Sequence, residues 1–164
     1  MAPSLISIKA PFALKTENGF IKSREITHMY ASIVVAIDIA QLDRGEQILK
    51  KAVALLDQGG KIALVNVVEE LPSYLAIDVP TDLLGSARQE AMTKLQDLRE
   101  RVGTSASIDV RTGAPAHEIL AAAQAYSADL IVLASHKPDF SNYLIGATAD
   151  RVVRHAKCSV LVDR

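Results

Sequence analysis

The chain has 164 residues, of which 49% are hydrophobic, 23% charged and only 4% aromatic. This length suits one domain with a substantial core, and the aliphatic composition is typical of a buried parallel sheet. The formal net charge of −1 excludes a strong overall field that would attract nucleic acid or an anionic membrane, although it leaves room for a local basic patch.

The number of cysteines and the lengths of the apolar runs indicate in which compartment the protein is expected. The single cysteine, Cys158, excludes an intramolecular disulfide and a cysteine metal cluster. No apolar run approaches the length of a membrane span, and the opening residues lack a secretory signal. We therefore expect a cytoplasmic protein, without membrane insertion and without a nucleic-acid partner.

Residues 1–28 differ in composition from the rest of the chain, because they combine prolines, a glycine and scattered charges. We expect a tail or arm that is disordered or loosely docked, followed by one domain over residues 29–164. The alternating pattern of residues 4–13 makes an additional strand, and hence a functional arm, the alternative.

Apolar runs and helical stripes alternate along the domain. Residues 43–58 carry a one-sided apolar stripe that predicts a helix ending at Gly59 and Gly60, and residues 81–102 predict a long helix ending at Gly103. The segment 69–80 contains two prolines and is expected to be a loop. The remaining predicted elements are strands over residues 31–37, 61–68, 108–112, 130–134 and 159–162, and helices over residues 116–126 and after Gly146.

Strands that alternate with helices predict an α/β fold of the Rossmann-like type, a five-stranded parallel sheet with helices on both faces. The longest helix precedes the third strand, so we expect the strand order 3-2-1-4-5. The switch point then lies between the first strand, which Asp38 follows, and the fourth, which Ser135 and His136 follow. Ligands bind at such a point, beyond the carboxyl ends of the strands.

The stretch LIVLASHKPDFSNYLIGAT, residues 130–148, is the strongest candidate site. It reads as strand, polar loop and helix, with Gly146 at the beginning of the helix. Unpaired N–H groups and the positive end of the helix dipole suit a phosphate or another anion there. Catalysis lacks support, because the chain contains no Walker motif, no G-x-G-x-x-G and no paired histidines at metal spacing.

From residue 29 to 164 the chain resembles the universal stress proteins, a family related to adenine-nucleotide-binding α/β domains. The resemblance rests on VVAID at residues 34–38, on GAP at 113–115 and on residues 130–164. ATP-binding members carry G-x2-G-x9-G-[ST] in the last segment. Here Ala134 replaces the first glycine, Lys137 or Pro138 the second, and Ala147 the Ser or Thr.

These departures leave the proposed anion site largely intact. Gly146 keeps the close approach of the backbone to phosphate, and the N–H groups of Ala147 and Thr148 do not depend on side chains. The hydroxyl missing at Ala147 costs on the order of 1.5–3 kcal/mol of binding free energy, part of which Thr148 is placed to restore.

The resemblance implies that ATP, with or without Mg²⁺, is bound between the first two strands and the turn at Gly113. Asp38 would hold the ribose or the metal, and Val67 would line the adenine slot. From the residues alone, the alternatives are that Asp38 caps a turn, that Val67 packs in the core and that Gly113 is a turn glycine. The implied site residues are Ala36, Asp38, Val67, Gly113, Ala134, Ser135, His136, Lys137, Gly146, Ala147 and Thr148.

The resemblance further implies a stress-response regulatory module that forms a homodimer through the edge strand 159–162 and acts on an unidentified regulatory protein. One alternative is a dimeric interaction scaffold that binds no nucleotide, which the replaced glycines favour. The other is a low-turnover ATPase or autophosphorylating protein, for which the sequence offers no catalytic residue.

Overall fold

The computed structural model describes residues 15–16, 19–20, 29–69, 82–135 and 146–164. The strands of the domain are β3 (Tyr30–Ala36), β4 (Leu56–Val68), β5 (Ser107–Thr112), β6 (Leu130–Ala134) and β7 (Ser159–Asp163). Its helices are α1 (Leu42–Leu55), α2 (Asp82–Val102), α3 (Pro115–Ala125) and α4 (Ala147–His155). A separate antiparallel pair joins β1 (Lys15–Thr16) to β2 (Gly19–Phe20). The additional strand considered over residues 4–13 lies outside the described residues.

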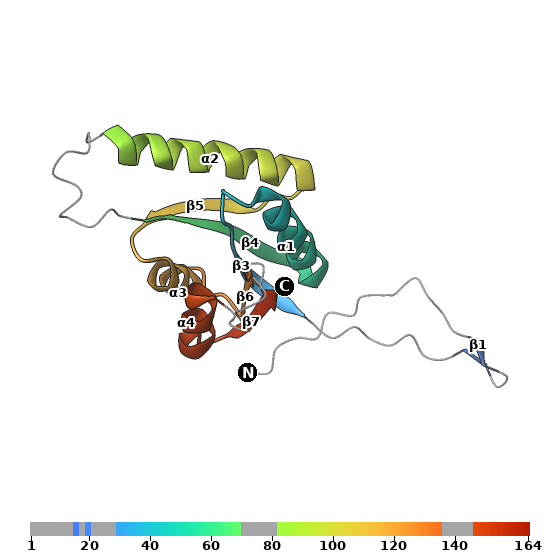
Figure 1. Cartoon of the computed structure of the whole chain (residues 1–164). Helices are drawn as coiled ribbons and strands as arrows, with labels where there is room; N and C mark the ends of the chain where they lie inside the picture. The colour runs from blue at the N-terminus through green and yellow to red at the C-terminus, as the bar shows by residue number, and fades with distance from the viewer. Residues whose placement is uncertain (1–14, 17–18, 21–28, 70–81, 136–145) are drawn as a thin grey trace.

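The five strands of the domain are all parallel and lie in the order β5-β4-β3-β6-β7 (Figure 1). Counted along the domain, this is the predicted order 3-2-1-4-5, so the expected Rossmann-like architecture is confirmed. The order reverses between β3 and β6. The chain continues from β3 into α1 and from β6 toward α4. A ligand site is expected between the carboxyl ends of these two strands, where the strand order reverses.

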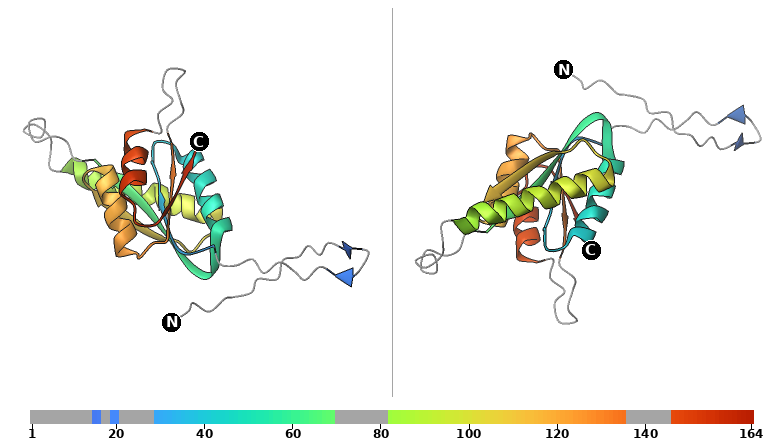
Figure 2. Two further views of the ribbon diagram at one scale, coloured as in Figure 1. Left: turned by 90° about the horizontal axis from the view of Figure 1, so that it is seen from below. Right: turned by 90° about the horizontal axis from the view of Figure 1, so that it is seen from above.

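Helices cover both faces of the sheet (Figure 1 and Figure 2). On β3, Ile33 and Val35 pack with α1 and α2, whereas Val34 points to the opposite face and packs beneath α3. Successive side chains of a strand point to opposite faces, so a central strand buried on both sides must be apolar at every position. That requirement explains why β3 and β6 read as continuous aliphatic runs rather than alternating ones.

The first helix ends earlier than its sequence pattern predicts. α1 ends at Leu55, and β4 begins directly at Leu56, so the prediction that Gly59 and Gly60 terminate the helix is wrong. The two glycines instead form an irregularity in β4, where the pairing with β3 changes register. Gly59 has φ +82°, and a Cβ on Gly60 would lie 3.0 Å from the carbonyl oxygen of Ala31. Glycine is required there by a bulge, not by a helix end.

Carboxylates hold the amino end of β3. Asp129 accepts hydrogen bonds from the backbone N–H groups of Ala31, at 2.8 Å, and Ser32, at 3.0 Å. Asp57, which is only 6% exposed, accepts another from the N–H of Met29 at 2.8 Å. Backbone donors that have no strand partner at this end are therefore satisfied by negative charge, which shortens and strengthens such bonds.

The last strand, β7, lies at an edge of the sheet and pairs only with β6 among the described strands. It runs one residue beyond its predicted end, to Asp163, whose carboxylate forms an ion pair with Lys51 of α1. No helix among the described residues is long and apolar enough to cross a membrane.

Candidate functional site

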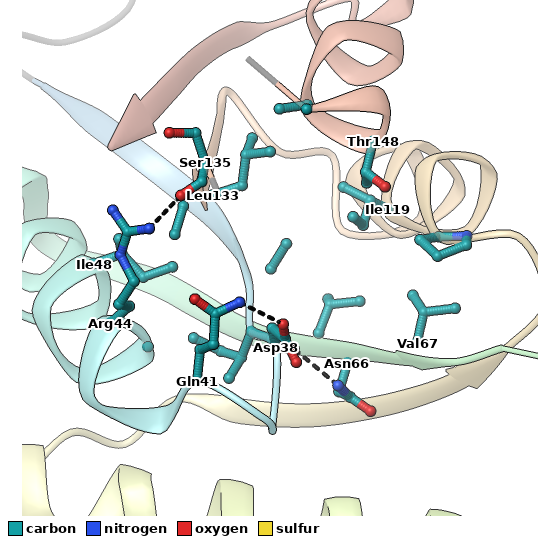
Figure 3. Close-up of a pocket in the computed structure, with 18 of the residues that line it drawn as sticks. Asp38, Gln41, Arg44, Ile48, Asn66, Val67, Ile119, Leu133, Ser135 and Thr148 are labelled. Atoms are coloured by element: carbon teal, nitrogen blue, oxygen red, sulfur yellow. Dashed lines mark hydrogen bonds between the residues drawn. The ribbon is translucent and has the colours of Figure 1, made fainter. Parts of the chain in front are cut away.

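A cavity of about 360 Å³ opens at the carboxyl ends of β3, β4 and β6 (Figure 3). The first turns of α1 and α4 close its sides. Every described residue that the sequence analysis assigned to a nucleotide site, except Gly113, lines this cavity. Those residues are Ala36, Asp38, Val67, Ala134, Ser135, Gly146, Ala147 and Thr148. His136 and Lys137 lie outside the described residues.

The beginning of α4 forms one wall of the cavity. Gly146 occupies the N-cap position with φ +91° and ψ 142°, and no side chain caps the helix. The first intrahelical bond runs from the N–H of Asp150 to the carbonyl of Gly146, at 2.9 Å. The N–H groups of Ala147, Thr148 and Ala149 precede that bond and have no intrahelical acceptor. They, with the helix dipole, form a site suited to an anion.

Asp38 lies two residues beyond β3, at the mouth of the cavity. Its Oδ1 accepts a hydrogen bond from the N–H of Ala40 at 2.9 Å, and its Oδ2 accepts one from Nε2 of Gln41 at 3.0 Å. The carboxylate therefore closes the turn into α1, as the simpler interpretation of this residue predicted. It remains exposed, and contact with ribose or metal stays a prediction. Among the described residues, no group of three or more His, Cys, Asp or Glu could hold a metal.

Arg44 is a cation of the cavity that the sequence analysis missed. It lies in the first turn of α1, half-buried, and its guanidinium donates a hydrogen bond to the backbone carbonyl of Ser135, the residue that follows β6 (Figure 3). The signal in the sequence was helical spacing. Arg44 precedes the buried Ile48 by four residues, so it lies on the same face of the helix, above the core.

Asn66 is a second polar residue that the sequence analysis missed. Its side chain is 5% exposed and donates a hydrogen bond from Nδ2 to the carbonyl of Ile37 at 2.8 Å. Its Oδ1 is buried without a hydrogen-bond partner among the described residues. The signal was a single amide inside the apolar run KIALVNVV, since a polar residue in a buried strand needs partners of its own.

The other walls of the cavity are mostly apolar. Val67 is partly buried and packs against the core cluster beneath α3, so core packing accounts for part of its role. Ile119 of α3 and Leu133 of β6 add further aliphatic surface. Small-molecule sites have mainly apolar walls with a few convergent polar groups and volumes of about 300–1,000 Å³, which this cavity matches.

Gly113 lies beside the cavity rather than in its lining. Its φ is +139°, and a Cβ at this position would lie 3.3 Å from Cγ of Glu118. That carboxylate pairs with Arg111 at 3.5 Å, and Arg111 in turn donates to Asp109 at 2.8 Å. Burial works to lower the pKa of Arg111, but the two carboxylates outweigh it and raise the pKa. The positive φ of Gly113 agrees with its interpretation as a turn glycine, and these charges hold the turn between β5 and α3.

The charges around the cavity favour an anionic group beside Arg44 and the start of α4, and the apolar walls favour a neutral group. Arg44 and the free N–H groups of α4 supply positive potential, whereas Asp38 and Glu69 line the outer rim. None of the described lining residues forms the hydrogen-bonded nucleophile and base pair that covalent catalysis requires. This arrangement can bind a ligand.

Comparison with known proteins gives one consistent family. The model of the universal stress protein family matches residues 29–164. Universal stress protein MJ0531 from Methanocaldococcus jannaschii is 29% identical over 152 residues, which cover 88% of this chain and 87% of that protein.

Solved structures of similar fold point to the same family. Universal stress protein UspA from Lactobacillus plantarum has a TM-score of 0.67 and 26% identity, and covers 82% of this chain and 98% of its own. A universal stress protein in complex with cAMP has a TM-score of 0.52 and 22% identity, and covers 83% and 98%. At the latter identity the likeness concerns the fold alone.

Proposed function

The chain belongs to the universal stress protein family, and from this premise we propose that it binds an adenine nucleotide, ATP foremost, in the cavity at the carboxyl end of the sheet. In this proposal the protein is a stress-response regulatory module that is active when the nucleotide is bound. The observation that carries the proposal is the start of α4, where a glycine N-cap leaves backbone N–H groups facing a cavity that also holds an arginine.

The residues present are compatible with each part of the nucleotide. Phosphate oxygens would accept hydrogen bonds from the N–H groups of Ala147 and Thr148. The base would lie against the aliphatic surface of Ala36 and Val67. Asp38, exposed at the rim, would hold the ribose or an accompanying Mg²⁺, which would neutralise phosphate charge. Adenine is proposed as the base because a universal stress protein of the same fold is in complex with cAMP.

Assembly and location complete the proposal. The edge strand β7 carries Val160, Leu161 and Val162, which are only half-buried, and its outer backbone groups are unpaired among the described strands. Such an edge pairs readily with another copy of itself, so we propose a homodimer through β7. The module would act in the cytoplasm on a regulatory protein that responds to the nucleotide state.

Calorimetric titration of Mg·ATP into nucleotide-free protein tests this function. The variant Ala147→Asp places a carboxylate at the first position of α4, where it stabilises the helix by about 0.3–1 kcal/mol but repels phosphate. Ala147 is exposed, so the side chain has room. The matched control is Ala147→Asn, which has the same shape without the charge.

We expect binding by the native protein and the asparagine control, and a loss of at least about tenfold in the aspartate variant. Equal affinity in all three proteins would show that the nucleotide lies elsewhere. No heat at millimolar ATP in the native protein would refute nucleotide binding and support the interaction scaffold instead.

A further inference from the structure

We propose that Arg44 is the residue that reads the phosphate charge of the ligand, so that the cavity prefers a nucleoside polyphosphate to a nucleoside. The inference rests on the proposed function and deepens it. Arg44 comes from α1, a part of the chain outside the glycine-containing segment on which the predicted anion site depended.

The guanidinium of Arg44 is fixed before any ligand binds. Its hydrogen bond goes to the carbonyl of Ser135, and the N–H of Ser135 donates to the carbonyl of Asp163 at 2.7 Å. The residue that Arg44 contacts is therefore anchored to the neighbouring strand β7 through its own N–H. The backbone of Arg44 is anchored as well, because its N–H donates to the carbonyl of Gln41 at 3.1 Å in the first turn of α1.

Several cations of the domain are neutralised by a carboxylate, and Arg44 is not. Lys50 pairs with Glu46, Arg154 with Asp150, and Lys51 with Asp163. Arg44 has no ion pair among the described residues, although it is half-buried, and it donates its hydrogen bond to a neutral carbonyl. A guanidinium has several N–H donors, so most of its binding capacity is unused. A partly desolvated charge in this state gains strongly from an anionic partner.

The position of Arg44 completes a two-sided anion site. Figure 3 shows its guanidinium beside Ser135, with Thr148 of α4 at another side of the same cavity. A phosphate chain between them would meet a full positive charge from α1 and the free N–H groups of α4. The fork of a guanidinium also matches a phosphate group bidentately, which an ammonium does not.

Titration of three ligands into three variants tests the inference. The ligands are ATP, adenosine and inorganic tripolyphosphate, and the variants are Arg44→Gln, Arg44→Lys and Lys50→Gln. The last is the matched control, because it removes one cation from the same helix at a largely exposed position away from the cavity lining. Circular dichroism verifies that each variant is folded.

We expect Arg44→Gln to weaken ATP and tripolyphosphate by at least about tenfold and to leave adenosine within about twofold of the native affinity. Arg44→Lys should recover only part of the loss. The Lys50→Gln control should bind all three ligands as the native protein does.

Other results overturn the inference. If ATP and adenosine weaken equally in Arg44→Gln, the side chain acts only through the position of Ser135. Unchanged ATP affinity in that variant contradicts a role in reading charge. If the native protein binds tripolyphosphate through Arg44 but neither ATP nor adenosine, the proposed function fails while the charge-reading role stands. Failure to bind any of the three ligands refutes both.

Discussion

The two ends of the sheet solve opposite hydrogen-bonding problems. At the amino end of β3, unpaired backbone N–H groups are bound by carboxylates, those of Asp129 and the buried Asp57. At the carboxyl end, carbonyls that project beyond β3 and β6 are bound by side-chain donors, those of Asn66 and Arg44. The difference lies in the side chains that flank the strand ends, because carboxylates lie at the amino end and an amide and a guanidinium lie at the carboxyl end.

The two ends also differ in the hydrogen-bonding groups that remain available to a ligand. At the amino end, both oxygens of Asp129 are occupied by backbone donors. At the carboxyl end, Arg44 has unused N–H donors, and the N–H groups at the start of α4 add more. The helices at the carboxyl end therefore supply unused donors, which explains why an anionic ligand is expected there and not at the amino end.

Replacing a buried hydrogen-bond donor by an acceptor at the carboxyl end should have the largest effect on stability. Asn66→Asp keeps the shape of the side chain but removes the donor to Ile37 and buries a charge. We expect the free energy of unfolding to fall by about 3–5 kcal/mol near neutral pH, measured by urea denaturation. Gln47→Glu, the same chemical change at an exposed position of α1, should change it by less than about 0.5 kcal/mol.

The loss in Asn66→Asp should also depend on pH. Burial and the facing carbonyl of Ile37 raise the pKa of the introduced carboxyl in the folded state above its unfolded value. The variant is therefore least destabilised below the unfolded pKa, where the protonated carboxyl can donate to that carbonyl. Stability relative to the native protein should be lost as pH rises through the folded pKa. A loss that does not change with pH would contradict the need for a donor.

The converse exchange at the amino end should have a smaller but clear effect. Asp129→Asn leaves one acceptor oxygen for the N–H groups of Ala31 and Ser32 and turns a donor toward the other. We expect a loss of about 2–3 kcal/mol in the free energy of unfolding with unchanged ATP affinity. The control Asp150→Asn, at an exposed helical ion pair, should lose less than about 0.5 kcal/mol. Equal losses in the two variants would count against the account.

Backbone strain at the carboxyl end gives the smallest expected effect on stability. Gly146→Ala meets no atom within 4 Å but must adopt φ +91°, so we expect a loss of about 1–2 kcal/mol and weaker ATP binding. Gly103→Ala, also at positive φ and in open space, lies at the end of α2 and should lose a similar stability while binding ATP normally. Equal ATP affinities in the two variants would show that the N-cap of α4 does not shape the site.

The sequence predicts the sheet well because its main signals are local. Continuous apolar runs indicate strands buried on both faces, and chain alternation with right-handed crossovers leaves few strand orders. The error at Gly59 and Gly60 shows the limit. A glycine pair after a helical stripe is typical of a helix end, but the pairing of β4 with Tyr30 extends the strand back to Leu56. Long-range pairing of this kind has no local signature.

The site divides in the same way. The beginning of α4 could be predicted, because Gly146 and the residues that follow are contiguous in sequence. Arg44 and Asn66 could not be assigned to it from local pattern. Each donates a hydrogen bond to a backbone carbonyl that follows a different strand. The partner is 91 residues away in sequence for Arg44 and 29 residues away for Asn66. Only the fold brings these donors together at the carboxyl end of the sheet.

The most direct test of the central claim is a titration of Mg·ATP into ¹⁵N-labelled protein, followed by two-dimensional NMR of the amide groups. Binding at the carboxyl end predicts the largest shifts at Ala147, Thr148 and Ala149, with a matching shift of the Arg44 side-chain N–H. Shifts confined to one face of α2, which Gly85, Gln89 and Lys94 share, would contradict it. So would an unchanged spectrum at millimolar ATP.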